Sequence, residues 1–217
     1  MEVKLYNEDC MEGMKRYPDK YFELAIVDPP YGIGEDRTKR PCRGHTETKN
    51  HIVKGWDKEP ASVEYFRGLE RISQNRIIWG ANHFISRIPF DSPCWIVWDK
   101  LSVGNTADCE LAWTSFPTAV KKFKFLWEGF WQGDMANKEQ RIHPTQKPVK
   151  LYEWLLKNYA KEGDKILDTH LGSGSIAIAC YNLDFDLTGF EIDKDYYDGA
   201  VNRLEEHKKQ QRLFDGN

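Results

Sequence analysis

The chain has 217 residues, 40% of them hydrophobic, and carries a formal net charge of −3. This length and apolar content suit one domain with a substantial core, and the overall charge gives no sign of nucleic-acid binding. The sequence has no apolar run of about 18 residues and no basic-apolar leader, so we expect neither a membrane-spanning nor a secreted protein. Its five cysteines are scattered and odd in number, which favours a reducing compartment over a disulfide framework.

Strand and helix patterns alternate at both ends of the chain and predict an α/β fold with a doubly wound, mostly parallel sheet. We expect strands at 3–6, 24–27, 77–79, 95–98, 110–113, 165–168 and 187–191, and a strand with one exposed face at 121–125. Helices are expected at 10–16, from Pro148 to before Gly163, from Ser175 onward, and at 194–211. The C-terminal strand-helix units are predicted to precede the N-terminal ones in the sheet, so that the chain ends meet between neighbouring strands.

The tetrapeptide Asp28-Pro29-Pro30-Tyr31 follows the apolar run 24–27 and so lies at the carboxyl end of a buried strand, where open α/β sheets bind ligands. Its two prolines remove backbone donors and stop the strand, so the carbonyls of the turn need donors from elsewhere. A nucleobase NH2 group has two donors, one for the Asp28 carboxylate and one for the Pro29 carbonyl, and Tyr31 offers a ring for stacking. The alternative is a surface turn with an incidental Asp and Tyr.

A second group of candidate residues follows the strand at 165–168. Gly172-Ser173-Gly174 is a turn whose backbone can approach a ligand closely. The strand at 187–191 ends in Glu191, 19 residues after Gly172, where its carboxylate can accept hydrogen bonds from ribose hydroxyls. This pattern predicts a nucleoside pocket, and the spacing Gly172-x-Gly174-x-x-Ala177 suits a dinucleotide equally well.

With these two groups in this order, and with His143-Pro144-Thr145-Gln146-Lys147-Pro148 between them, the chain resembles the β-class amino-methyltransferases of DNA. These enzymes methylate adenine N6 or cytosine N4 with S-adenosylmethionine (SAM). The resemblance covers nearly the whole chain and implies a Rossmann-like SAM-methyltransferase fold, circularly permuted, with a seven-stranded sheet, SAM as cofactor and no metal. The chain departs from the usual family motif at Thr169, His170 and Ser175, where the family carries Pro, Phe and Thr.

The resemblance also implies roles for individual residues. Asp28, Pro29, Pro30 and Tyr31 are the expected catalytic residues. The expected SAM site comprises Asp9, Thr145, Lys147, Asp168, His170, Gly172, Ser173, Gly174 and Glu191. Of these, Asp9 is expected near the adenine, and Thr145 and Lys147 near the methionine carboxylate, with a helix cap and a surface cation as their alternatives. Hydrogen bonds to Asp28 and Pro29 are expected to make the target amine more tetrahedral for in-line attack on the methyl group.

We expect a single methyltransferase domain over 1–217, with a basic insertion at about 36–56 and no separate target-recognition domain. The insertion carries Arg37, Lys39, Arg40, Arg43, Lys49 and Lys54 beside the catalytic turn, which favours contacts with DNA phosphates. A solvated loop is the alternative, with Lys121, Lys122 and Lys124 as a second candidate DNA surface. We expect double-stranded DNA as the partner, with the target base flipped out, and no membrane. The resemblance further implies a cytoplasmic enzyme of bacterial or phage origin, and a homodimer stays open.

The predicted activity is site-specific methylation of adenine N6 in DNA, in a restriction-modification system or as a phage-borne enzyme. Four alternatives remain: methylation of cytosine N4, methylation of an RNA base, an NAD-type dehydrogenase built on the glycine pattern, and a non-catalytic DNA-binding module. A dehydrogenase leaves the tetrapeptide at 28–31 unexplained. The intact Asp28 and Tyr31 speak against a non-catalytic module.

Overall fold

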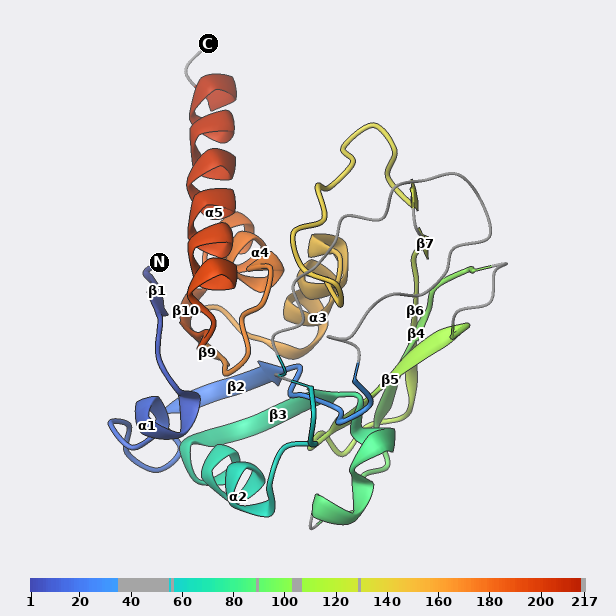
Figure 1. The fold of residues 1–217 in the computed structure, drawn as a ribbon, viewed down its shortest axis with the longest axis vertical. Coiled ribbons are helices and arrows are strands. Elements are labelled where there is room, and N and C mark those ends of the chain that lie inside the picture. Colours follow the sequence, from blue (N-terminus) through green and yellow to red (C-terminus); the bar gives the residue numbers. More distant parts are fainter. Residues whose placement is uncertain (35–54, 56, 89, 103–106, 129, 216–217) are drawn as a thin grey trace.

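The computed structural model describes residues 1–34, 55, 57–88, 90–102, 107–128 and 130–215, without the side chains of 212–215. An eight-stranded sheet lies at its centre, with helices on both faces (Figure 1). The strands of this sheet are β1 (Val3–Tyr6), β2 (Phe22–Val27), β3 (Ser73–Trp79), β4 (Trp95–Asp99), β5 (Cys109–Thr114), β6 (Lys121–Lys124), β9 (Lys165–Asp168) and β10 (Asp186–Phe190). The α-helices are α1 (Cys10–Met14), α2 (Val63–Ile72), α3 (Val149–Tyr159), α4 (Ser175–Leu183) and α5 (Lys194–Asp215). Two short 3-10 helices (Ala81–His83 and Ile85–Arg87) and a small hairpin of β7 (Trp127–Glu128) and β8 (Trp131–Gln132) complete the described elements.

The strands lie in the order β1-β10-β9-β2-β3-β5-β4-β6. Neighbours from β1 to β3 are parallel, β5 runs antiparallel to both β3 and β4, and β6 is parallel to β4. The N-terminal strand β1 pairs with β10, the last strand of the chain, with Val3 opposite Leu187. The predicted doubly wound, mostly parallel α/β fold and the meeting of the two chain ends in the sheet are therefore confirmed.

The sheet has one strand more than the seven that the resemblance implied. The additional strand is β6, which pairs with the outer side of β4, with Lys121 opposite Ile96. Its three lysines are exposed, whereas Phe123 packs against the core, so the expected strand with one exposed face is confirmed. Lysines on an edge strand also oppose pairing with the edge of another molecule.

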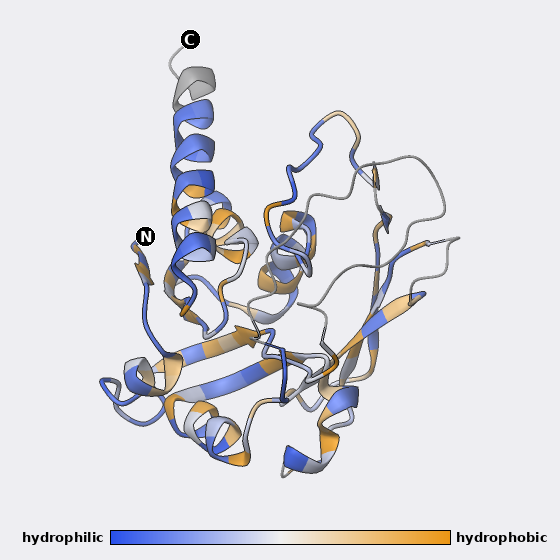
Figure 2. Ribbon diagram, viewed as in Figure 1, coloured by the Kyte–Doolittle hydropathy of each residue, from blue (hydrophilic) through white to orange (hydrophobic). Residues whose placement is uncertain are grey.

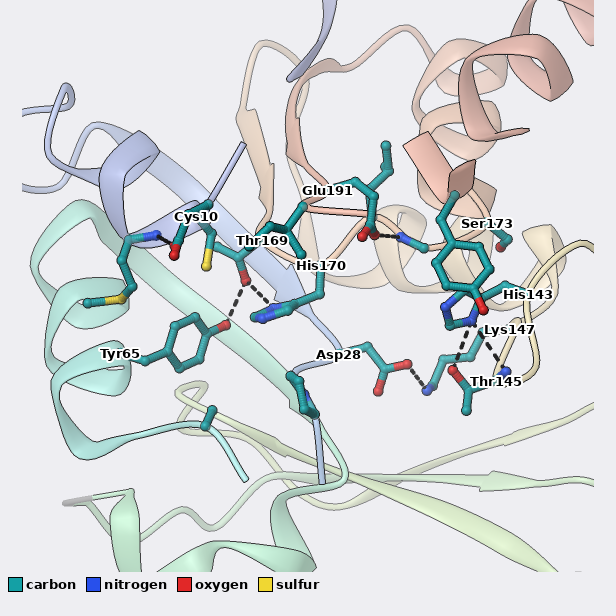
Figure 3. A pocket seen from close by; sticks show the side chains of 18 of the residues that line it. Cys10, Asp28, Tyr65, His143, Thr145, Lys147, Thr169, His170, Ser173 and Glu191 are labelled. Carbon is teal, nitrogen blue, oxygen red and sulfur yellow. Dashed lines mark hydrogen bonds and ion pairs between the residues drawn. The ribbon is translucent and has the colours of Figure 1, made fainter. Parts of the chain in front are cut away.

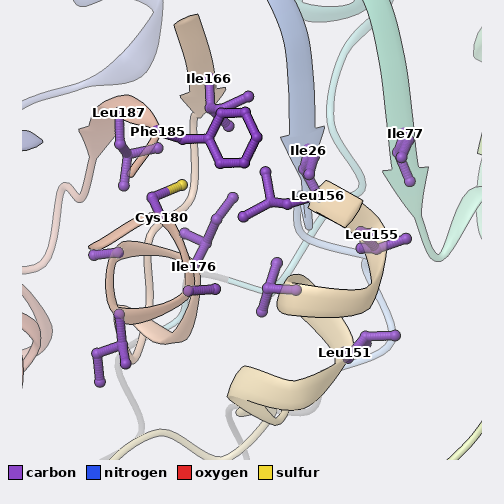
Figure 4. Close-up of a cluster of buried hydrophobic side chains, with 14 of the residues drawn as sticks. Ile26, Ile77, Leu151, Leu155, Leu156, Ile166, Ile176, Cys180, Phe185 and Leu187 are labelled. Carbon is purple, nitrogen blue, oxygen red and sulfur yellow. The ribbon is translucent and has the colours of Figure 1, made fainter. Parts of the chain in front are cut away.

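The central strand β2 supplies side chains to both faces of the sheet because successive residues of a strand point in opposite directions. Leu24 and Ile26 join the core formed with α3 and α4 (Figure 4). Ala25 and Val27 join the second core, formed with α1 and α2. All four side chains are at most 1% exposed, which explains why this strand is an uninterrupted apolar run.

In Figure 2 the central strand β2 is coloured mostly hydrophobic, whereas the upper coloured turns of α5 are mostly hydrophilic. Within the described part of the chain, no helix combines the length and the hydropathy that crossing a membrane requires.

The carboxyl ends of β1, β10, β9 and β2 meet at one edge of the sheet because these four strands are parallel neighbours. The segments that end or follow them carry Asp9, Glu191, Asp168 and Asp28. Neighbouring strands are only about 4.8 Å apart, so the fold gathers four acidic residues over a short stretch of this edge.

Candidate active site

A cavity of about 410 Å³ opens above these strand ends (Figure 3). The turn after β2, the segment before α3 and the glycine turn after β9 all contribute to its wall, so the three sequence motifs meet here. The lining residues include Asp9, Cys10, Asp28, Pro30, Tyr65, His143, Thr145, Lys147, Thr169, His170, Gly172, Ser173 and Glu191.

Both oxygens of the Asp28 carboxylate have partners within the protein. The Tyr31 hydroxyl donates to Oδ1 at 2.5 Å, and the Lys147 ammonium forms an ion pair with Oδ2. The same ammonium lies 3.3 Å from the Tyr31 hydroxyl oxygen. A carboxylate offers about four lone-pair sites, so Asp28 retains acceptor capacity for a further donor. Its two partners fix the orientation in which that capacity is presented.

The proline carbonyls of the turn are less free than the sequence led us to expect. The Pro30 carbonyl accepts a hydrogen bond from the Ala61 amide at 3.3 Å, so its donor comes from within the chain. The reason is that the segment before α2 returns to the turn, where Tyr31 and Pro60 form an isolated β-bridge. The Pro29 carbonyl remains the predicted acceptor for a target amine.

The Tyr31 ring lies close to the backbone at the end of β3. A Cβ on Gly80 would come within 2.0 Å of Tyr31 Cε1, and Gly80 has a φ of 67°, so only glycine suits this position. The exposed His83 ring stacks on Tyr31, with 5.0 Å between centroids and 13° between planes. Burial, reinforced by the Asp28 and Glu110 charges, raises the pKa of Tyr31, so its hydroxyl stays a donor. Stacking of a target base on Tyr31 stays a prediction, and it requires a ring face that His83 does not cover.

Glu191, at the end of β10, anchors the glycine turn. Its Oε2 accepts from the Gly172 amide at 2.8 Å, and its Oε1 accepts from the Asp193 amide at 2.9 Å. Burial raises the pKa of this carboxyl. Gly174 begins α4 with a φ of 70°, and a Cβ there would lie 2.9 Å from Ala200 Cβ on α5. The turn is therefore held from two sides, and its backbone lies at the cavity wall.

Asp168, at the end of β9, is 2% exposed, and its Oδ1 accepts from the His170 amide at 3.0 Å. Burial raises the pKa of its carboxyl to about 8, and the nearby charges of Asp28 and Glu191 act in the same direction. The charge of Lys147 acts in the opposite direction but does not outweigh burial, so this carboxyl is largely protonated at neutral pH. A positively charged ligand group would favour the ionised form.

Two of the three residues that depart from the family motif, Thr169 and His170, form a hydrogen-bonded chain with Tyr65. The Tyr65 hydroxyl on α2 lies 2.6 Å from Thr169 Oγ1, which in turn lies 3.0 Å from His170 Nδ1. The two rings of this chain also meet edge to face, with 5.3 Å between centroids. Burial lowers the pKa of His170 to about 4, so its imidazole is neutral at physiological pH. Polar contacts thus link this wall of the cavity to α2.

The side chains of Asp9, Thr145 and Lys147, which were also predicted to bind the cofactor, have partners within the protein. Asp9 caps α1, accepting from a backbone amide of the first turn at 2.7 Å. Thr145 Oγ1 lies 3.1 Å from His143 Nδ1, and the ammonium of Lys147 points to Asp28 (Figure 3). Contacts of Thr145 and Lys147 with the methionine carboxylate of SAM stay predictions.

Three residues of the site had no motif to mark them in the sequence. Tyr65 lines the cavity from α2, and Glu110 on β5 lies 3.2 Å from the Lys147 ammonium. Arg203 on α5 donates to the Ser173 carbonyl at 2.9 Å. The apolar spacing of α2 offered a local signal for Tyr65. The contacts of Glu110 and Arg203 join segments that are far apart in the sequence, and local patterns do not predict such contacts.

The predicted DNA-contacting residues of the basic insertion, Arg37, Lys39, Arg40, Arg43, Lys49 and Lys54, lie outside the described residues. The second candidate surface, Lys121, Lys122 and Lys124, is exposed on the edge strand β6. Neither surface is tested as a DNA contact by the geometry.

Residues 95–202 match the family model N6_N4_Mtase, described as DNA methylase. The type II methyltransferase M.HpaI of Haemophilus parainfluenzae is 26% identical over 244 residues, covering 94% of this chain and 75% of that protein. M.HinfI of Haemophilus influenzae is also 26% identical over 244 residues, covering 92% of this chain and 67% of that protein.

Solved structures of DNA methyltransferases share the fold, and two of them illustrate the likeness. The M1.HpyAVI-SAM complex has a TM-score of 0.58 at 21% identity, covering 93% of this chain and 100% of that one. The PvuII DNA methyltransferase, described as cytosine-N4-specific, has a TM-score of 0.64 at 12% identity, covering 100% of this chain and 94% of that one.

The permuted α/β sheet, the glycine turn and the acidic strand ends define a SAM-dependent methyltransferase, and SAM is its cofactor. The match of residues 95–202 identifies which kind of methyltransferase it is. The chain belongs to the N6/N4 DNA methylase family, and the resemblance inferred from its three motifs is confirmed.

Proposed function

We propose that this enzyme methylates the exocyclic N6 of adenine at a specific site in double-stranded DNA. The observation that carries the proposal is the Asp28 carboxylate, which Tyr31 and Lys147 orient at the cavity wall one residue before the Pro29 carbonyl. These two acceptors suit the two N–H groups of an amino substituent. The Asp at the first position of the tetrapeptide is the form that the family resemblance associates with adenine.

Several features of the cavity support SAM binding. Backbone amides and small side chains of the turn at 172–174 permit close approach, and Glu191 retains lone pairs for ribose hydroxyls beyond the two amides it already accepts. The buried Asp168 carboxyl would ionise beside the positive charge of the cofactor. Bound SAM supplies a methyl group on an already activated sulfonium. The protein itself has to orient the amine and accept its hydrogen bonds, with Asp28 as the principal acceptor.

The decisive experiment is incubation of the protein with SAM and mixed genomic DNA, followed by nucleoside mass spectrometry. We expect N6-methyladenine, and methylation-sensitive sequencing should locate it at one recognition sequence. N4-methylcytosine as the product would replace the adenine proposal with its nearest rival. Methyl transfer to RNA alone would move the substrate to single-stranded bases.

We further propose that the basic insertion positions the duplex through its phosphates. Replacing Arg37, Lys39, Arg40 and Arg43 by Ala should weaken binding to all sequences and leave SAM binding unchanged. The log-log salt slope should fall by roughly 0.9 for each duplex phosphate that the variant no longer neutralises. The triple change of Lys121, Lys122 and Lys124 to Ala is the matched control. If this control rather than the insertion variant weakens binding, the DNA surface lies at β6.

The proposed organisation is one methyltransferase domain over 1–217, acting in the cytoplasm of a bacterium or during phage infection. A role beside a restriction enzyme is the biological setting that this activity suits. Sedimentation of the protein with and without duplex DNA tests whether a homodimer forms.

A further inference from the structure

Four charged side chains alternate in sign beside the catalytic turn. Lys100 Nζ lies 2.5 Å from Glu110 Oε1, and Glu110 Oε2 lies 3.2 Å from Lys147 Nζ. The Lys147 ammonium then pairs with Asp28. Lys100 follows β4, Glu110 lies on β5, Lys147 precedes α3 and Asp28 follows β2, so four separate segments build this series.

The series is largely shielded from water. The side chain of Lys147 is 3% exposed, those of Asp28 and Lys100 are 16% exposed, and that of Glu110 is 24% exposed. A single buried ion pair would already neutralise Asp28, and burying a second carboxylate and a second ammonium adds desolvation cost. Neutralising Asp28 therefore does not explain why Glu110 and Lys100 are also buried here.

The contacts of the Lys147 ammonium indicate what Glu110 does. Three oxygen atoms surround this ammonium: it donates hydrogen bonds to Asp28 Oδ2 and the Tyr31 hydroxyl, and it forms an ion pair with Glu110 Oε2. Glu110 gives the ammonium a second anionic partner besides Asp28 Oδ2. Without that partner, the ammonium, already in contact with Oδ2, would be free to turn about the Asp28 carboxylate and occupy lone pairs that the target amine requires.

We propose that Glu110 is a positioning residue for methyl transfer: it holds the Lys147 ammonium on one oxygen of Asp28 and so keeps the rest of that carboxylate available to the amine. The inference rests on the proposed function because it takes Asp28 as the acceptor of the target amine. Lys100 supports Glu110 in this role by pairing with its other oxygen.

The protonation of Lys147 should determine how the rate of methyl transfer changes with pH. Burial lowers the pKa of Lys147, but the Asp28 and Glu110 charges outweigh it and raise the pKa above its usual range. Neutral Lys147 would no longer orient Asp28, so the rate of methyl transfer should fall on the alkaline side. Removing the Glu110 charge should move this alkaline limb to lower pH, and removing the Lys100 charge should move it to higher pH. Asp28, Tyr31 and Glu110 contact the Lys147 ammonium, and the Asp168 carboxyl interacts with its charge. Lys100 interacts with Glu110, and Tyr152 interacts with both Asp28 and Glu110.

The test compares Glu110→Gln and Lys100→Gln with Glu162→Gln, a matched control exposed in the turn after α3. Single-turnover methyl transfer to duplex DNA is measured against pH, and SAM affinity is measured by calorimetry. For Glu110→Gln we expect a loss of about 10- to 100-fold in rate, typical of a misplaced catalytic group. SAM affinity should fall far less than the rate, and the alkaline limb should shift in opposite directions in the two variants. Glu110→Asp should recover part of the rate, and Glu162→Gln should match the wild type.

A second readout does not depend on turnover. NMR titration of 13Cε-labelled lysine follows the Lys147 ammonium in each folded variant, and its pKa should fall in Glu110→Gln and rise in Lys100→Gln. Wild-type rate and alkaline limb in Glu110→Gln would overturn the inference while leaving the proposed function intact, as would a loss confined to SAM affinity. Absence of methyl transfer to any DNA by the wild type would instead overturn the proposed function itself.

Discussion

The Tyr31 hydroxyl donates a hydrogen bond to Asp28 Oδ1 at 2.5 Å, so the aromatic residue of the tetrapeptide orients the acid three residues before it. Tyr31→Phe should therefore slow methyl transfer, because a hydrogen bond to a charged group contributes about 1.5–3 kcal/mol. Tyr31→Ala should lose more, since a base-aromatic stack contributes a further 1–3 kcal/mol or so. Single-turnover rates of the two variants give the comparison. Equal rates in Phe and Ala variants would show that the ring does not hold the base.

Asp28 and Glu191 should separate catalysis from cofactor binding. Asp28→Asn should remove most methyl transfer and leave SAM affinity nearly intact, because Asp28 is assigned to the target amine. Glu191→Gln should weaken SAM binding, since Glu191 accepts from the Gly172 amide and holds the glycine turn. Calorimetry with SAM and a DNA methylation assay measure the two effects. Wild-type turnover in Asp28→Asn would refute the catalytic assignment.

Asp168 should make the stability of the ligand-free protein depend on pH. Its pKa is raised from 3.8 to about 8 in the folded state. Between these values the folded protein holds a proton that the unfolded chain has released, so the stability contribution is present at low pH and is lost as pH rises toward about 8. Thermal unfolding of Asp168→Asn should lack this component. The wild type should therefore lose stability relative to Asp168→Asn across this range, and parallel curves would contradict the shift.

Tyr65 should influence the cofactor site from outside the three motifs. Tyr65→Phe removes the hydroxyl that lies 2.6 Å from Thr169 Oγ1 but keeps the ring that meets His170. Loss of a neutral hydrogen bond of this kind costs about 0.5–1.5 kcal/mol. We expect weaker SAM binding with an unchanged fold, measured by calorimetry and circular dichroism. Thr169→Val removes this hydrogen bond from the other side and also the one to His170 Nδ1, so it should weaken SAM binding further.

Arg203 should link stability to the glycine turn. It pairs with Glu139 and donates to the Ser173 carbonyl and to Ser175 Oγ, and its side chain is 13% exposed. Arg203→Met leaves the Glu139 carboxylate without its cation and should destabilise the fold by about 3–5 kcal/mol. The double variant with Glu139→Gln should recover stability in denaturant unfolding without recovering SAM affinity. Full recovery of both would reduce Arg203 to a structural ion pair.

Local patterns in the sequence predicted the strand segments that are buried on both faces of the sheet. The run 24–27 is apolar because β2 packs on both sides. The end of β3 at 77–79 follows the same rule, whereas its polar first half at 73–76 was not predicted as strand. The glycine turn was recognisable because Gly174 takes a φ of 70°, which favours glycine. Helix α2 was missed even though Ser62 caps it and Tyr65, Phe66, Leu69 and Ile72 share its buried face. The missed helix is the one that carries Tyr65 into the site.

The sequence by itself determined where strands and motifs lie along the chain, because hydrophobic periodicity and turn chemistry are local properties. Parallel neighbours then brought Asp28, Asp168 and Glu191 to one edge. Only the tertiary structure decided which groups these acids meet. Glu110 on β5 forms an ion pair with Lys147 before α3, and the Pro30 carbonyl accepts a hydrogen bond from the Ala61 amide. Burial raises the pKa of Asp168. Distances and burial depend on how separate segments pack, and a pattern within one segment contains no record of that packing.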